Sequence, residues 1–439
     1  MSKALDTLPD EFPPYQPRPA GAPRALDGVR VIDFTHFIAG PLATMMLADM
    51  GADVIKIEPP ARGDELRYYP PVLPELPERG APFFWANRSK RSLALDLKKP
   101  EAVEVARELI RGADIVIENF SAGVMQRLGL GYDVCRALNP GVVFCAVSAY
   151  GREGPYADRL GFDPIAQAES GFVAMNGYPD RQGVRASSAV MDISTAMMVG
   201  NAVLGALYAR QRLGEGQYVE VGLFDTALLM TGWASMQHLM TGMPHKRHGN
   251  TSIDTCPSGV FQSQDQAFYI NCGNDKIFNR LALQVLERPD LADDPVLADR
   301  NGRLARQEEL FRTLDEIFAT QPWAYWQERM RAAQIPCGEV RSVGQALRSP
   351  EARARDLVSW IAHPEVGQVP NIASPIRFAR TPVVDPTPAP NIGQHSVEIL
   401  REVLGYDDAR IAALAAVGVF GQRVCAEAEA APAAGRAER

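Results

Sequence analysis

Two aspartates near the middle of the chain are the strongest candidates for chemistry. Asp192 lies between an apolar extended piece and a long apolar helix, and Asp163 directly precedes a proline. Aspartate before a helix is a preferred N-cap, and a helix N-terminus favours the ionised carboxylate that could attack an activated carbonyl. The pattern therefore predicts Asp192 as both a helix cap and a candidate covalent nucleophile. Asp163 fits an Asx turn as well as a site.

A carboxylate that attacks a thioester forms a mixed anhydride and releases a thiolate. That chemistry needs an oxyanion site and a pocket for a long anionic thiol carrier. Gly249-Asn250 and Gly273-Asn274 could supply backbone N–H groups, although each dipeptide also fits an ordinary turn. The dense cluster Asn87-Arg-Ser-Lys-Arg91 is suited to an adenosine 3′-phosphate.

Composition excludes several other classes of function. The net charge of −8 comes without a basic run, so we expect no nucleic-acid partner. The six cysteines lack C-x-x-C spacing, and His245 and His248 are the single close histidine pair, so we expect no disulfide framework and no metal site. No G-x-S-x-G elbow occurs. The Pro-rich start lacks a secretory h-region and no run approaches the length of a membrane span, which predicts a cytoplasmic protein.

Alternating apolar strands and amphipathic helices surround these residues and predict an α/β fold with a parallel sheet covered on both faces. The expected strands are 29–33, 53–57, 114–117, 142–147 and 218–223, and the expected helices are 42–50, 101–111 and 193–212. The first turn, Thr35–Pro41, lacks the G-x-G-x-x-G fingerprint of dinucleotide-binding folds, which argues against a dehydrogenase.

The alternation of strands and helices ends at about residue 245. The following segment is expected to form two short strands within 260–270 and helices over 276–287 and 307–333, which predicts a smaller α+β domain. We expect the chain then to return to the first domain. The predicted divisions are a Pro-rich arm (1–26), a large domain (27–225), a small domain with linkers (226–340), a return segment (341–422) and a disordered tail (423–439).

Several motifs in one order resemble class III CoA-transferases, from about Leu26 to Gly421. They are Asp33–Pro41, Gly51–Glu58, Asn87–Ser92, Ile117–Phe120, Arg127–Tyr132, Asp192 and Gly214–Gln217. The resemblance implies a Rossmann-like large domain with a smaller domain, and an interlocked homodimer. It also implies a coenzyme A thioester as substrate, with no other cofactor.

Carried over residue by residue, the resemblance places Asp192 on the nucleophile that forms an aspartyl anhydride and then an aspartyl-CoA thioester. The positions that it implies around the substrate and CoA are His36, Ile38, Arg91, Leu95, Lys98, Asn119, Phe120, Arg127, Phe162, Asp163 and Gly249. The pattern is most similar to the succinyl-CoA:glutarate type. Arg67, Arg185 and Arg247 are candidates to bind the second carboxylate of such an acid.

Three departures from the wider family bear on the reaction. Formyl-CoA transferases have a glutamine where this chain has Ile38, and a double arginine where it has Pro59-Pro60, which disfavours oxalate and formate. Related α-methylacyl-CoA racemases have a histidine where this chain has Phe162, and racemisation needs that base. The alternatives to a transferase are therefore an acyl-CoA racemase or epimerase and a non-catalytic acyl-CoA-binding protein.

Overall fold

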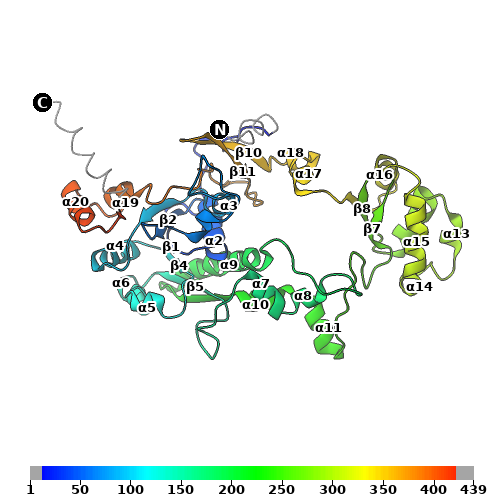
Figure 1. Cartoon of the computed structure of the whole chain (residues 1–439), viewed down its shortest axis with the longest axis horizontal. Coiled ribbons are helices and arrows are strands. Elements are labelled where there is room, and N and C mark those ends of the chain that lie inside the picture. The colour runs from blue at the N-terminus through cyan, green and yellow to red at the C-terminus, as the bar shows by residue number, and fades with distance from the viewer. Residues whose placement is uncertain (1–11, 422–439) are drawn as a thin grey trace. The chain divides into compact units, whose positions relative to one another are not determined.

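The computed structural model describes residues 12–421, and the chain divides into two compact units (Figure 1). The large unit comprises Met1–Ser170, Ala186–Thr231 and Pro350–Arg439, and the small unit comprises Gly171–Arg185 and Gly232–Ser349. The small unit thus includes Gly171–Arg185, which we had placed in the large domain. The expected tail, 423–439, lies outside the described residues.

A six-stranded parallel sheet forms the centre of the large unit and confirms the predicted α/β class. Its strands run in the order β3-β2-β1-β4-β5-β6. This order reverses direction between β1 and β4, and ligands of doubly wound sheets bind at that point, beyond the carboxyl ends of the strands. The strands are β1 (Arg30–Phe34), β2 (Asp53–Glu58), β3 (Arg91–Ala94), β4 (Ile115–Glu118), β5 (Val143–Ser148) and β6 (Tyr218–Gly222).

Alternate residues of each central strand enter two separate cores. In β1, Ile32 packs with the core that contains Leu109 and Leu400, whereas Val31 packs with the core that contains Leu47 and Val203. Because both faces are covered by helices, the strands read as continuous apolar runs in the sequence. The sequence located five of the six strands to within a residue or two, but it did not predict β3, which lies at an edge of the sheet.

Helices on both faces complete the large unit. They are α2 (Ala39–Asp49), η2 (Glu65–Tyr68), α3 (Ala81–Asn87), α4 (Pro100–Arg111), α5 (Val124–Arg127), α6 (Tyr132–Leu138), α7 (Asp163–Glu169), α9 (Val190–Leu213), α10 (Leu223–Met230), α18 (Pro350–Ala354), α19 (Ser396–Glu402) and α20 (Asp408–Ala416). The hairpin β10 (Val358–His363) and β11 (Gly367–Ile372) belongs to the same unit. Tyr15 in the N-terminal arm donates its backbone N–H to Trp360 in β10 over 3.0 Å.

Helix α9 is, among residues 12–421, the one helix long and apolar enough to cross a bilayer by length and composition. Its side chains Val199 and Val203 are fully buried against the sheet core. Packing inside the large unit therefore accounts for the apolar residues on the buried face of the helix.

The small unit has its own core around a three-stranded antiparallel sheet, as its predicted α+β pattern suggested. The predicted single helix over 307–333 is wrong: α15 ends at Phe318, and a second helix starts after Pro322. The elements are α8 (Phe172–Met175), α11 (Trp233–Thr241), β7 (Ser258–Gln262), β8 (Ala267–Asn271), α12 (Asp275–Arg280), η3 (Leu281–Val285), α13 (Pro289–Asp293), α14 (Arg300–Ala305), α15 (Gln307–Phe318), α16 (Trp323–Ala332), β9 (Cys337–Glu339) and α17 (Val343–Leu347).

Candidate active site

A cavity of about 330 Å³ lies within the large unit, at the carboxyl ends of the sheet strands. Residues that follow β1, β4 and β5 line it, and so do Phe162 and Asp192. Its position at the reversal of strand order is the one that doubly wound sheets use for ligands. The cavity brings together residues that the sequence had singled out separately: His36, Asn119, Phe120, Phe162 and Asp192.

Asp192 is in the first turn of α9, but it does not cap that helix. The N-cap is Ala189, which makes no side-chain hydrogen bond, so the expected N-cap role of Asp192 is wrong. The sequence reading misplaced the start of the helix, because Val190 and Met191 already have helical backbone geometry. The carboxylate of Asp192 is consequently not used in a cap and lies on the cavity wall.

Asp163 supplies the missing cap from outside the helix. Its carboxylate accepts the backbone N–H of Met191 at 2.7 Å and that of Asp192 at 3.4 Å. The Gln167 amide donates to the same carboxylate at 2.5 Å and accepts the Ala186 N–H at 2.8 Å. Asp163 itself is buried at the start of α7. Its hydrogen bonds thus join α7 to α9 and fix the turn that carries Asp192.

Burial, with a smaller contribution from the neighbouring charge of Asp163, raises the pKa of Asp192 to about 7. No hydrogen bond or ion pair to the Asp192 carboxylate occurs within residues 12–421. A carboxylate with a pKa near neutrality, on the wall of a cavity, is a recognised mark of a functional group. It is also more basic, and hence a stronger nucleophile when ionised, than an ordinary aspartate.

His36 and Asn119 connect the two strands on either side of the reversal point. The Asn119 side-chain oxygen accepts the His36 backbone N–H at 2.9 Å, and its amide donates to the His36 carbonyl at 2.8 Å. The His36 ring packs against Phe120 with centroids 5.6 Å apart. Burial lowers the pKa of His36, so its ring is neutral at physiological pH.

Arg152 is a cavity residue that the sequence reading missed. Its guanidinium donates to both Glu118 oxygens, at 2.8 and 2.9 Å, and to the carbonyls of Phe120 and Val147. Arg159 lines the same cavity and pairs with Glu169. Neither arginine belongs to a recognisable local motif, so only the fold brings them to the site.

Several predicted CoA-site residues do not line this cavity. Leu95 is fully buried in a core, and Lys98 and Arg127 are exposed. Arg91 forms ion pairs with Asp53 at 2.6 Å and Glu398 at 3.0 Å. Ile38, which we expected to influence substrate choice, is the N-cap of α2 and packs on the core below it.

Gly249 belongs to the small unit and has a φ of +58°. Its N–H donates to the Gly177 carbonyl at 2.9 Å, and a Cβ at this position would lie 2.5 Å from the Tyr178 ring. A glycine is therefore required here by local packing.

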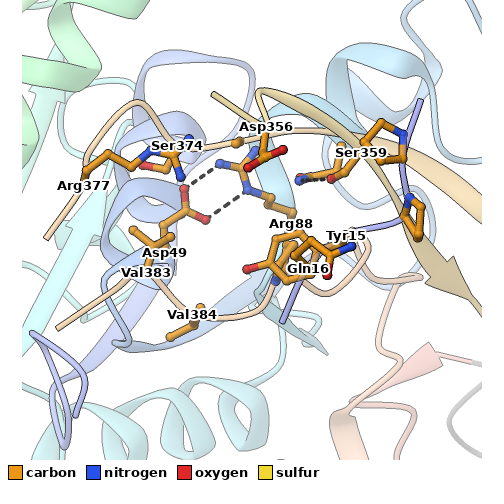
Figure 2. Close-up of a pocket in the computed structure, with 15 residues that line it drawn as sticks. Tyr15, Gln16, Asp49, Arg88, Asp356, Ser359, Ser374, Arg377, Val383 and Val384 are labelled. Atoms are coloured by element: carbon orange, nitrogen blue, oxygen red, sulfur yellow. Dashed lines mark hydrogen bonds and ion pairs between the residues drawn. The ribbon is translucent and has the colours of Figure 1, made fainter. Parts of the chain in front are cut away.

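The basic cluster 87–91 is largely engaged in structural ion pairs. Arg88 donates to both oxygens of Asp49, at 3.0 and 2.5 Å, beside a smaller cavity of about 120 Å³ (Figure 2). Lys90 is fully buried and pairs with Asp33 at 3.1 Å. These two cations stabilise the fold rather than present free charge.

The three arginines considered for a second substrate carboxylate also have structural partners. Arg67 is fully buried, pairs with Glu58 at 2.6 Å and stacks 3.8 Å from the centre of the Phe83 ring. Arg247 donates to three backbone carbonyls of the small unit. Arg185 also belongs to the small unit. Within the described chain, no group of three or more His, Cys, Asp and Glu side chains is placed to hold a metal ion.

Comparison with known proteins identifies the class. The family model described as CoA-transferase family III matches residues 26–396. A succinate–glutarate CoA-transferase of Agrobacterium fabrum is 35% identical over 86% of this chain and 95% of its own. An acetyl-CoA:oxalate CoA-transferase of Acetobacter aceti is 36% identical over 77% of this chain and 87% of its own. The crystal structure of a CAIB/BAIF family protein from Brucella suis matches with a TM-score of 0.78 at 32% identity, over 87% of this chain and 100% of that one.

The chain therefore belongs to CoA-transferase family III. It is a CoA-transferase enzyme, which confirms the class that the sequence motifs indicated.

Proposed function

We propose that Asp192 is the covalent nucleophile of a CoA transfer between two carboxylic acids. Its carboxylate attacks the thioester carbonyl, the C–S bond breaks, and the CoA thiolate leaves with the bonding electrons. The thiolate then attacks the aspartyl carbonyl of the mixed anhydride, so that the donor acid departs and an aspartyl-CoA thioester remains. The acceptor carboxylate repeats both steps in reverse and regenerates Asp192, without net gain or loss of protons.

One observation carries this proposal: Asp192 is a cavity carboxylate with a pKa of about 7, and no cation within residues 12–421 forms an ion pair with it. An ion pair would stabilise the ionised form and weaken it as a nucleophile. The Asp163 hydrogen bonds to the start of α9 hold the backbone of Asp192 while its side chain reacts. The arrangement thus supports covalent catalysis rather than simple binding.

We propose succinyl-CoA as donor and a dicarboxylate such as glutarate as acceptor, following the printed activity of the Agrobacterium relative. The cation for the second carboxylate would be Arg159, because it lines the cavity and its ion pair with Glu169 is solvent-accessible, whereas the ion pairs of Arg67 and Arg152 are largely buried. Oxalate remains the competing acceptor, given the Acetobacter relative.

Around this reaction, we propose that His36, Asn119, Phe120, Phe162 and Asp163 form the acyl and thiol end of the site. The CoA nucleotide would extend toward Arg127, at the end of α5. We retain Ile38, Arg91, Leu95, Lys98 and Gly249 as weaker candidates. The proposed enzyme uses CoA thioesters without a further cofactor, acts as a homodimer and is cytoplasmic.

Racemisation is the main alternative within acyl-CoA chemistry. Its two-base mechanism needs a proton acceptor on each face of the α-carbon. The residue before Asp163 is Phe162, which supplies none. We therefore favour transfer over racemisation. α-Proton exchange with deuterated water, without an acceptor acid, would support racemisation instead.

Trapping of the enzyme-bound intermediate tests the proposal. The protein is incubated with succinyl-CoA and quenched with hydroxylamine or borohydride, and its peptides are analysed by mass spectrometry. We expect modification of Asp192 only when the acyl-CoA is present, and no transfer by Asp192→Ala. Asp225 provides a matched control, because it is the third residue of α10 as Asp192 is of α9, and it is exposed. Full transfer by Asp192→Ala would refute the mechanism.

A panel of acceptor acids then tests the substrate assignment. Glutarate, succinate and oxalate are compared by kcat/KM with succinyl-CoA as donor. Arg159→Gln should reduce kcat/KM for glutarate more than for a monocarboxylate such as butyrate. Equal losses for both acids would exclude Arg159 as the second-carboxylate site.

A further inference from the structure

Phe37 has a backbone conformation that bulky residues rarely adopt. Its φ is +62°, in the left-handed region that favours glycine, asparagine and aspartate. It is the third of the four residues between β1 and α2, and it lines the cavity. Such a conformation persists only where surrounding groups hold it, and strained residues of this kind concentrate at functional sites.

The first group that holds the turn is a buried ion pair. The Asp64 carboxylate accepts the Phe37 N–H at 3.0 Å and pairs with Lys56 at 3.0 Å, and both side chains are essentially inaccessible. The Lys56 ammonium also donates to the Thr35 carbonyl at 2.6 Å. Two residues of the turn are therefore fixed by charged groups that solvent does not reach.

Asn119 is the second group. Its two hydrogen bonds to the His36 backbone hold the residue before Phe37 on both sides. Asp33 completes the set, because it accepts the Thr35 N–H at 2.8 Å. Three consecutive residues are thus anchored to β1, β2 and the end of β4.

The anchored backbone places the Phe37 ring between two other aromatic side chains, Phe162 and Tyr69. The ring meets Phe162 edge to face, with centroids 5.8 Å apart, and meets Tyr69 in the same way at 5.8 Å. Phe162 directly precedes Asp163, whose carboxylate caps the helix that carries Asp192. Phe37, Phe162 and Asp192 all line the cavity.

We propose that Phe37 is a specificity-determining residue, whose anchored ring forms the wall that limits the length of the acyl chain beside Asp192. The inference rests on the proposed function, since it takes this cavity as the acyl site. A flexible side chain could move aside for a longer acyl group. The anchored backbone of Phe37 fixes the point from which its ring projects, and rotation of the ring would lose its edge-to-face contacts with Phe162 and Tyr69.

Binding of a homologous series of ω-carboxyacyl-CoA thioesters tests the inference. Succinyl-CoA and suberyl-CoA differ in chain length but share both charged ends. Their Kd values are measured by calorimetry on protein that carries Asp192→Ala, so that no turnover occurs, and kcat/KM is measured with Asp192 intact. Phe37→Gly removes the ring and suits the left-handed backbone, and Phe37→Asn provides a second variant that tolerates the same φ.

Both Phe37 variants should shift the Kd ratio toward suberyl-CoA by about tenfold or more, since each methylene in an apolar pocket discriminates on that scale. Gln334→Gly is the matched control, because Gln334 also has a positive φ, of +54°, but is exposed in the small unit. It should leave the ratio unchanged.

An unchanged ratio in folded Phe37→Gly and Phe37→Asn would overturn the inference, as would failure of both thioesters to bind. A shifted ratio without any Asp192 adduct in the trapping experiment would retain the role of Phe37 and refute only the covalent mechanism. The two failures are therefore distinguishable.

Discussion

The carboxylate of Asp163 accepts the backbone N–H of Asp192 over 3.4 Å, so one aspartate holds the peptide unit of another. The same contact places two negative groups close together, which contributes to the raised pKa of Asp192. Asp163 thus helps to position the candidate nucleophile and adds to the rise in its pKa that burial mainly causes. This relationship leads directly to a pH dependence.

Transfer activity should rise as the pH increases through about 7, because the ionised form of Asp192 is the nucleophile and its pKa is near that value. The measurement is kcat/KM for succinyl-CoA from pH 5.5 to 8.5. Asp163→Asn removes the neighbouring charge and should move the rise to lower pH. A profile that is flat over this range would contradict the role of Asp192.

Asp192→Asn should stabilise the protein more at pH 8.5 than at pH 5. The folded-state pKa of Asp192 is raised above its unfolded value of 3.8, so the folded state retains its proton to higher pH. The wild type therefore loses stability as the pH rises from about 4 through about 7. Thermal melts of both proteins at the two pH values measure the effect. An equal difference at both pH values would show that Asp192 ionises normally.

Asn119→Ala should impair both binding and chemistry, because it releases two hydrogen bonds that hold the His36 backbone. Buried groups left without partners cost about 1–3 kcal/mol each. Asn139→Ala is a matched control, since that amide also bridges backbone carbonyls, at Ile110 and Ala113. The control should lose comparable stability in urea unfolding but keep kcat per folded molecule. Equal loss of kcat in both variants would remove Asn119 from the site.

Arg67→Leu should destabilise the fold by about 3–5 kcal/mol, because it leaves Glu58 charged and buried without its partner. Arg62→Leu should cost under about 1 kcal/mol, since the Arg62–Glu65 pair is exposed. Urea unfolding measures both values. If Arg67→Leu instead leaves stability unchanged and raises KM for a dicarboxylate, Arg67 binds the second carboxylate of the substrate, which is the role for which the sequence makes it a candidate.

The sequence was informative where local pattern determines structure. The apolar runs around Ile32 and Ile117 predicted buried parallel strands. A strand that is buried on both faces has few polar residues, so it appears in the sequence as a continuous apolar run. Asn119 and Phe120 directly follow such a strand, so their place beyond its carboxyl end was also predictable.

Long-range contacts account for what the sequence did not predict. Asp163 caps a helix that begins 27 positions later, and no local signal identifies such a partner. The sequence singles out Ile38 rather than Phe37, because the side-chain directions within a turn depend on its φ values. From the sequence, Arg88 and Lys90 are part of a basic cluster that could bind phosphate. In the structure they form ion pairs with Asp49 and Asp33, which are distant in the sequence. In each case the deciding contact joins separate segments of the chain.

The helices α19 and α20 contribute Leu400 and Ile411 to the core that covers one face of the sheet, although they come from the end of the chain. A ribosome therefore synthesises all six sheet strands and the whole small unit before these two helices emerge. Until then the nascent large unit exposes side chains such as Leu109 that the finished protein buries. Transiently exposed apolar surface of this kind is prone to aggregation during synthesis.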